Sequence, residues 1–176
     1  MTEKLLLPVP KTGRDRKKYL PFYGKKYVLS NHFPLDRLQF DGISFHSSEQ
    51  LYFYMKAMHF GDKKTAGKIL KTKTAPQAKR FSNAIKGYDD KKWRGVSAEK
   101  MYQANLAKFT QFKHLGDALK KTGSMVLVEA SPRDLFWGVG YRATDPKAVD
   151  PSQWKGKNIL GEVLMRVRET ISKEEH

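Results

Sequence analysis

The segment from Ser47 to Phe60 constrains the fold most strongly, because it has the features of one complete helix. Ser47 or Ser48 can cap its first turn, and Gly61 directly follows its last residue. Apolar side chains recur along it at helical spacing, at Leu51, Tyr52, Met55 and Phe60. The pattern therefore predicts a helix that is buried along one side.

The same helix carries a carboxylate, Glu49, and an amine, Lys56, seven residues apart. Seven residues make two turns, so both side chains share a face, about 10 Å apart along the axis. On a face otherwise rich in aromatics, the pair could point into one cleft. In the simpler alternative, Glu49 stabilises the helix dipole and Lys56 is a solvated surface charge, since first-turn carboxylates are common.

Length and composition predict one globular domain. The chain has 176 residues, of which 39% are hydrophobic and 12% aromatic, enough to build a core. Cysteine is absent, which excludes disulfides and thiolate metal sites. Pro8 and Pro10 interrupt the short apolar run near the N-terminus, so we expect neither a signal peptide nor a membrane span, and a cytoplasmic location.

The formal net charge of +16 favours polyanionic partners, such as nucleic acid, nucleotides or phosphorylated metabolites. The basic residues are spread over the stretches 11–26, 63–80 and 86–94. A generally cationic, solvated surface therefore explains the charge equally well.

The order of local patterns predicts an α+β fold, a predominantly helical single domain with a small β-sheet. Residues 1–25 are basic and interrupted by prolines, and we expect them to form an arm beside a domain that spans residues 26–176. The Asp41-Gly42 pair predicts a hairpin over residues 38–45. Further elements are expected as strands at 27–29 and 124–130, helices at 62–70, 75–85, 97–112, 114–121 and from Asn158 onward, and a loop at 87–95 that holds Trp93.

Several kinds of site find no support in the sequence. The five histidines show no His-x-x-x-His spacing, so we expect no metal site and no metal cofactor. The nucleophile elbow of serine hydrolases, the P-loop and the dinucleotide-binding fingerprint are also absent. The remaining polar and aromatic candidates are Glu49, Lys56, Asp134, Asn31, Asn158, Trp93 and Trp137.

Five motifs follow one another in a recognisable order. They are Ser30-Asn31-His32-Phe33, the helix from Glu49 to Lys56, Met101-Tyr102 with Lys108-Phe109, Leu127–Asp134 with Trp137-Gly138-x-Gly140, and Asn158-Ile159-Leu160-Gly161 with Leu164–Arg168. Together they resemble the YbiA-like, or NADAR, family from residue 27 to residue 171. The chain departs from the family at Gln50, where a His is usual, and at Phe53, where a Gln is common. If that His protonates a leaving group, Gln50 cannot replace it.

The resemblance implies a metal-independent N-glycosidase without a cofactor, which hydrolyses the bond between ribose C1′ and a nitrogen. The substrates implied are ribosylated amino-pyrimidine intermediates of riboflavin synthesis, or ADP-ribosylated guanine in nucleic acid. Glu49 suits the carboxylate that stabilises positive charge at C1′, and Lys56 suits a nucleophile that forms a Schiff base with the opened sugar. Asp134 suits a group that holds ribose hydroxyls or a second acid or base, and direct attack by water remains the alternative to Lys56.

Substrate binding is assigned, on the same resemblance, to Asn31, Phe33, Trp93, Trp137, Gly138 and Asn158. The tryptophans can stack on a base and the asparagines can orient sugar or phosphate, but core packing and turn or helix capping are simpler explanations. Asp134 can likewise be a loop cap. Two other functions stay open: a non-catalytic module that binds ADP-ribose or nucleic acid, and a simple cationic nucleic-acid-binding protein.

Overall fold

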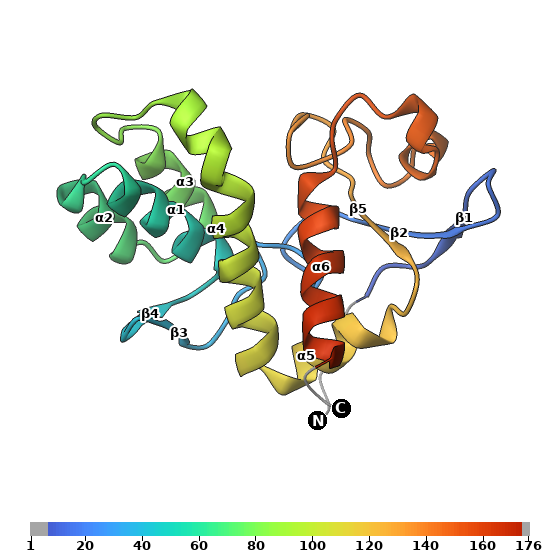
Figure 1. Cartoon of the computed structure of the whole chain (residues 1–176), viewed down its shortest axis with the longest axis horizontal. Helices are drawn as coiled ribbons and strands as arrows, with labels where there is room; N and C mark the ends of the chain where they lie inside the picture. Colours follow the sequence, from blue (N-terminus) through green and yellow to red (C-terminus); the bar gives the residue numbers. More distant parts are fainter. Residues whose placement is uncertain (1–6, 174–176) are drawn as a thin grey trace.

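The computed structural model describes residues 7–173, where helices dominate and a small sheet lies on one side (Figure 1). Within this range the α-helices are α1 Ser48–His59, α2 Lys63–Leu70, α3 Ala75–Ser82, α4 Asp90–Gln111, α5 Lys113–Lys121 and α6 Ile159–Lys173. Two short 3-10 helices, Pro146–Val149 and Pro151–Gln153, precede α6. The predicted α+β, mostly helical fold is confirmed.

The main sheet joins an N-terminal segment to a strand about a hundred residues later in the chain. Its strand order is β1 (Lys11–Thr12), β2 (Lys18–Phe22) and β5 (Val126–Glu129). β1 runs antiparallel to β2, whereas β2 runs parallel to β5, with Leu20 opposite Leu127. β3 (Leu38–Phe40) and β4 (Ile43–Phe45) form the expected hairpin, and both turn residues, Asp41 and Gly42, have the positive φ that such a turn requires.

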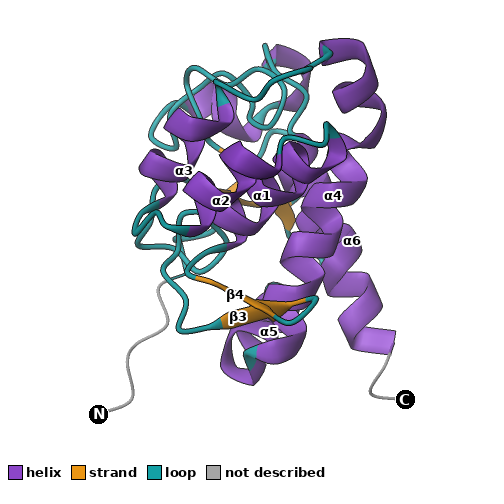
Figure 2. Cartoon of the chain, turned by 90° about the vertical axis from the view of Figure 1, so that its left-hand side faces the viewer, coloured by secondary structure: helices purple, strands orange, loops and turns teal. Residues whose placement is uncertain are grey.

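The core is built where α1, α4 and α6 pack side by side (Figure 1). Apolar side chains from all three helices are fully or almost fully buried there, among them Leu51, Met101 and Leu164. α2 and α3 pack against α1 as an outer layer, which faces the viewer in Figure 2. The predicted buried stripe of the 47–60 helix is confirmed, and Ser47 caps it by accepting a hydrogen bond from Gln50 N.

One helix begins earlier than the sequence pattern predicted. We expected a loop at 87–95 and a helix capped by Ser97, but α4 starts at Asp90, and Trp93 lies in its first turns. Asp89 is the actual cap, because its side chain accepts a hydrogen bond from Lys92 N at 2.8 Å. Both residues are good caps, and only packing decides between them: Ser97 is buried in mid-helix.

The strand predicted at residues 27–29 is wrong, since this segment forms successive turns that bury Val28 and Leu29. The strand lies earlier, at β2, inside the stretch that we expected to be an arm. Pro21 argued against a strand there, yet β1 covers only Lys18 and Tyr19, so Pro21 has a neighbouring strand on one side only. Residues 1–6 of the expected arm lie outside the described part of the chain.

Candidate active site

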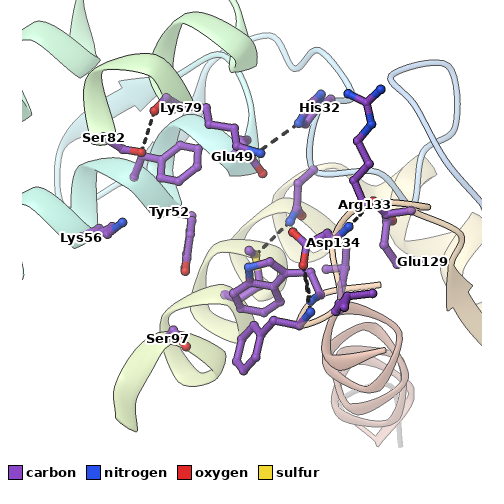
Figure 3. Close-up of a pocket in the computed structure, with 18 of the residues that line it drawn as sticks. His32, Glu49, Tyr52, Lys56, Lys79, Ser82, Ser97, Glu129, Arg133 and Asp134 are labelled. Atoms are coloured by element: carbon purple, nitrogen blue, oxygen red, sulfur yellow. Dashed lines mark hydrogen bonds and ion pairs between the residues drawn. The ribbon is translucent and has the colours of Figure 1, made fainter. Parts of the chain in front are cut away.

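A cavity of about 1020 Å³ opens between α1, α3 and α4 on one side and the loop after β5 on the other (Figure 3). Six predicted site residues line it: Asn31, Glu49, Lys56, Trp93, Asp134 and Trp137. Phe33, Gly138 and Asn158 do not. The structure therefore brings together residues that lie more than a hundred positions apart in the sequence.

Glu49 occupies the first turn of α1, at the positive end of the helix dipole. Its side chain is largely buried, and its Oε1 lies 3.5 Å from Nε2 of His32. The loop that carries His32 is fixed to the helix, since Glu49 N donates to the carbonyl of Asn31 at 3.2 Å. The carboxylate is thus held on a rigid element and faces the cavity.

Glu129, the last residue of β5, is a further acid in this cavity, and the sequence analysis missed it as a site residue. Burial raises the pKa of Glu129 to about 8, and the charges of Glu49 and Asp134 add to the effect. Its carboxyl group has no hydrogen bond or ion pair with any residue between 7 and 173. The sequence signal that could have identified Glu129 was its position, as a single acid at the end of a buried apolar strand.

Two predicted binding residues lie behind Glu129 rather than in the cavity. Asn158 accepts a hydrogen bond from Glu129 N and donates one to the carbonyl of Leu127, each at 2.9 Å. It thereby extends the edge of β5. At Gly138 a Cβ atom would lie 2.8 Å from the carbonyl oxygen of Glu129, so only glycine fits. Both residues fix the backbone that presents the Glu129 carboxyl group.

Asp134 has a structural task and also faces the cavity. Its Oδ1 accepts hydrogen bonds from Phe136 N at 3.0 Å and from Trp137 N at 2.8 Å. This is the loop cap that the sequence offered as the simpler explanation. The loop cap uses only one carboxylate oxygen, so the other is available to a sugar hydroxyl or a water.

Aromatic rings form one wall of the cavity. Tyr52 stands at the centre, with its ring centroid 5.4 Å from that of Trp93 and 5.5 Å from that of Trp137. Trp93 Nε1 donates to the Tyr52 hydroxyl at 3.0 Å. The wall is therefore a packed unit in which Tyr52 and Trp93 are almost fully buried and Trp137 is half-buried. Phe33 lies elsewhere, against the core.

Lys56 lines the cavity but stands apart from the carboxylates, on the far side of Tyr52 from Glu49 in Figure 3. Its side chain is partly buried, and this burial lowers the pKa of Lys56, an effect that the charge of Asp90 opposes. The amine lies 4.2 Å from the centre of the Tyr88 ring. The predicted shared face of Glu49 and Lys56 is present, with an aromatic ring between them.

The Asn31 side chain is occupied by the protein. Its Nδ2 donates to Met101 Sδ at 2.9 Å, and its Oδ1 accepts from Ser48 Oγ at 3.1 Å and Asn105 Nδ2 at 3.0 Å. These contacts tie the 30–33 loop to both α1 and α4. We therefore assign Asn31 a positioning role for the neighbouring His32.

Gln50 replaces the usual family His without entering the cavity. Its Oε1 accepts from His46 N at 2.8 Å and its Nε2 donates to the carbonyl of Ile69 at 2.9 Å. The amide thus ties α1 to the end of α2. Gln50 is therefore a structural residue in this chain.

Lys108 is a fully buried lysine that supports the segment leading into the 30–33 loop. Its amine donates to the carbonyls of Val28 at 2.6 Å and Ser30 at 2.9 Å. Burial lowers the pKa of Lys108 to about 7. The lysine joins α4 to the segment that carries Asn31 and His32.

Lys108 should make folding stability depend on pH. The unfolded chain keeps the Lys108 proton up to its ordinary pKa of 10.5, whereas the folded chain releases it near 7. The unfolded state therefore binds more protons in this window, and stability should rise by about 1.4 kcal/mol per pH unit between pH 8 and 10. Urea unfolding at pH 8, 9 and 10 measures the slope, which Lys108→Met should remove; an unchanged slope in the variant would contradict the assignment.

Basic side chains surround the cavity. Those that line it, besides Lys56, are Lys79, Arg94, Arg133, Lys155 and Lys157. Among residues 7–173 no group of three or more His, Asp or Glu side chains is arranged to hold a metal ion. The same range contains no helix that is long and apolar enough to cross a membrane.

Comparison with known proteins gives consistent matches. The NADAR domain matches residues 20–172. Protein irg-1 of Caenorhabditis elegans is 35% identical over 90% of this chain and 82% of its own length. N-glycosidase R617 of Acanthamoeba polyphaga mimivirus is 30% identical over 86% of this chain and 95% of its own length. A riboflavin biosynthesis protein of Vibrio vulnificus is 32% identical over 84% of this chain, but only over 36% of its own length.

A solved structure supports the same relationship. The NMR structure of the Escherichia coli protein YbiA superimposes with a TM-score of 0.73 at 26% sequence identity. The match covers 97% of this chain and 91% of YbiA. The match to YbiA thus extends over almost the whole chain, and the NADAR domain match begins at residue 20, inside β2.

Proposed function

The chain belongs to the NADAR domain family, which includes proteins named as N-glycosidases, and from this premise we propose that it hydrolyses a ribose C1′–N bond. The substrate we propose is a phosphorylated ribosyl or ADP-ribosyl compound. One observation carries the proposal: a largely buried carboxylate, Glu49, and a carboxyl group with a raised pKa, Glu129, face the same cavity.

These two acids suit the two demands of breaking the bond. As the C1′–N bond breaks, its electron pair leaves with the nitrogen, and Glu129 donates its proton to the leaving group. Positive charge then develops at C1′, and the Glu49 carboxylate stabilises it. His32, beside Glu49, helps to hold that carboxylate in place. Asp134 binds ribose hydroxyls through its free oxygen.

The sugar can then be released by two routes. In the first, the Lys56 amine attacks C1′ and passes one proton to the ring oxygen as the C1′–O bond breaks, which gives a protonated Schiff base that water hydrolyses to release the sugar and the amine. In the second, water attacks C1′ directly and loses its proton to the Glu129 carboxylate formed in the first step, which restores the acid. We favour Lys56 because burial lowers its pKa within the same cavity.

The cavity walls support the substrate class. Lys79, Arg94 and Arg133 can bind phosphate oxygens, and the Tyr52–Trp137 wall can stack on a base. Such binding alone would also suit a non-catalytic ADP-ribose reader. The convergence of Glu49 with Glu129, whose pKa is raised to about 8, favours turnover over simple binding.

Turnover is tested with two substrates, ADP-ribosylated guanosine and a phosphorylated ribosyl amino-pyrimidine. The released sugar is detected by mass spectrometry. We expect release from at least one of them without added metal, and chelator should not change the rate. Binding of both compounds without any released sugar would leave the non-catalytic reader as the better function.

The raised pKa of Glu129 predicts the pH dependence of the reaction. The group donates a proton only while it is protonated, so kcat/KM should fall about tenfold per pH unit above pH 8. Initial rates between pH 6 and 10 measure this limb. Glu129→Gln should have a low residual kcat/KM that does not fall above pH 8. A limb that persists in this variant would assign the titration to another residue.

A further inference from the structure

Half of the formal net charge of +16 comes from one stretch of the chain. Residues 63–86 hold eight lysines and arginines and no aspartate or glutamate. They form α2, α3 and the turns that follow each helix. These two helices pack against each other and against α1 as an outer layer, which faces the viewer in Figure 2, so the stretch lies on one side of the molecule. We call it the α2–α3 face.

All eight cations of the α2–α3 face are exposed and make no ion pair with any residue of the described chain. They are Lys63, Lys64, Lys68, Lys71, Lys73, Lys79, Arg80 and Lys86. Some surface cations elsewhere are paired, as Arg166 is with Glu99 at 2.8 Å, whereas none of these eight is. Generic solubility does not require one face to concentrate unpaired positive charge.

The acid nearest to this face does not neutralise it. Asp62 caps α2, with Oδ1 accepting from Thr65 N at 3.0 Å and Oδ2 accepting from Lys86 N at 2.9 Å. These bonds, together with the charge of Lys86, lower the pKa of Asp62 to about 2, and Asp62 is largely buried. Asp62 therefore supports the local fold, and the lysines above it remain available to a partner.

The α2–α3 face is continuous with the cavity. Lys79, Ser82 and Asn83, on and just after α3, are part of the cavity lining. Two large aromatic side chains are exposed beside them, Phe81 (37% exposed) and Tyr88 (43% exposed), and Tyr88 also lines the cavity. The α2–α3 face thus meets the edge of the candidate active site at Lys79, beside two exposed aromatic rings.

We propose that the α2–α3 face binds single-stranded nucleic acid and delivers a modified base to the cavity. Repeated unpaired cations match the regular phosphates of a backbone, and exposed rings stack on unpaired bases. A cavity with recessed acids can reach only a nucleotide outside a base stack, which favours a single strand over a duplex. The delivery of a modified base rests on the proposed function, but binding of the strand can be measured without turnover.

The test compares two variants that each lose four exposed cations. The face variant changes Lys64, Lys68, Lys71 and Lys73 to Gln, none of which lines the cavity. The matched variant changes Arg16, Lys121, Arg142 and Lys147 to Gln, which are exposed on other parts of the surface. Fluorescence anisotropy with an unmodified, labelled single-stranded 12-mer gives the affinity at several salt concentrations.

For the face variant we expect affinity to fall on the order of tenfold or more at moderate salt. The slope of log K against log salt should fall by about 3, since each lost phosphate contact removes about 0.7. The matched variant should lose less than about threefold. Turnover of a small ribosyl substrate should be unchanged in both, which separates this inference from the proposed function.

Two results would overturn the inference. Equal losses in the two variants would show that binding follows net charge, without a defined surface. Tighter binding of a duplex or of a polysulfated sugar than of the single strand would show that the α2–α3 face does not select single-stranded nucleic acid.

Discussion

Replacing Glu49 with glutamine is expected to lower kcat on the order of a hundredfold or more while the protein stays folded. The change keeps the side-chain size and the helical position but removes the negative charge opposite the developing cation at C1′. The interaction exists mainly in the transition state, so KM should change little. Steady-state kinetics and circular dichroism measure the two parts of the prediction.

Glu162→Gln is the matched control for Glu49→Gln. Glu162 also lies in the first turn of a helix, α6, but it is exposed and does not line the cavity. Any general effect of losing a first-turn carboxylate would appear in both variants. We expect wild-type kcat for the control, and an unchanged kcat in Glu49→Gln with a normal spectrum would remove Glu49 from the mechanism.

What the sequence could predict was encoded locally. The caps and apolar spacing of α1 placed Glu49 and Lys56 on one face, and Asp41-Gly42 specified the hairpin turn. Such signals lie within a few residues of what they determine, so they can be read without knowing the fold. The motifs then identified the family, and with it the cavity acids Glu49 and Asp134.

What the sequence could not predict depends on contacts between distant segments. β2 pairs with β5 across about a hundred residues, and no local pattern at Pro21 reveals that partner. The raised pKa of Glu129 likewise exists only because folding buries it and brings Glu49 and Asp134 near. Asn158 and Gly138 show the same effect, since their role in holding Glu129 depends on the packing of α6 and the loop against β5.

The second large effect is expected at Lys56, in the chemistry of the intermediate. A Schiff base between the Lys56 amine and C1′ can be reduced by borohydride to a stable secondary amine. When protein and substrate are mixed with borohydride, the protein mass should rise by that of the reduced sugar moiety, and peptide mapping should place the adduct on Lys56. The partial burial of Lys56 supports this, because desolvation disfavours the ammonium form and leaves more of the nucleophilic amine.

Lys56→Arg should abolish both the adduct and turnover, since a guanidinium stays protonated and is a poor nucleophile. Lys79→Arg is the matched control: Lys79 also lines the cavity, but it is exposed, so its solvated amine should form no adduct and its replacement should leave the Lys56 adduct in place. If no adduct forms and Lys56→Arg still turns over, Lys56 contacts only phosphate or hydroxyl groups. Glu129 would then act in both steps, first as the acid and then as the base that activates water, and the acids alone would account for hydrolysis.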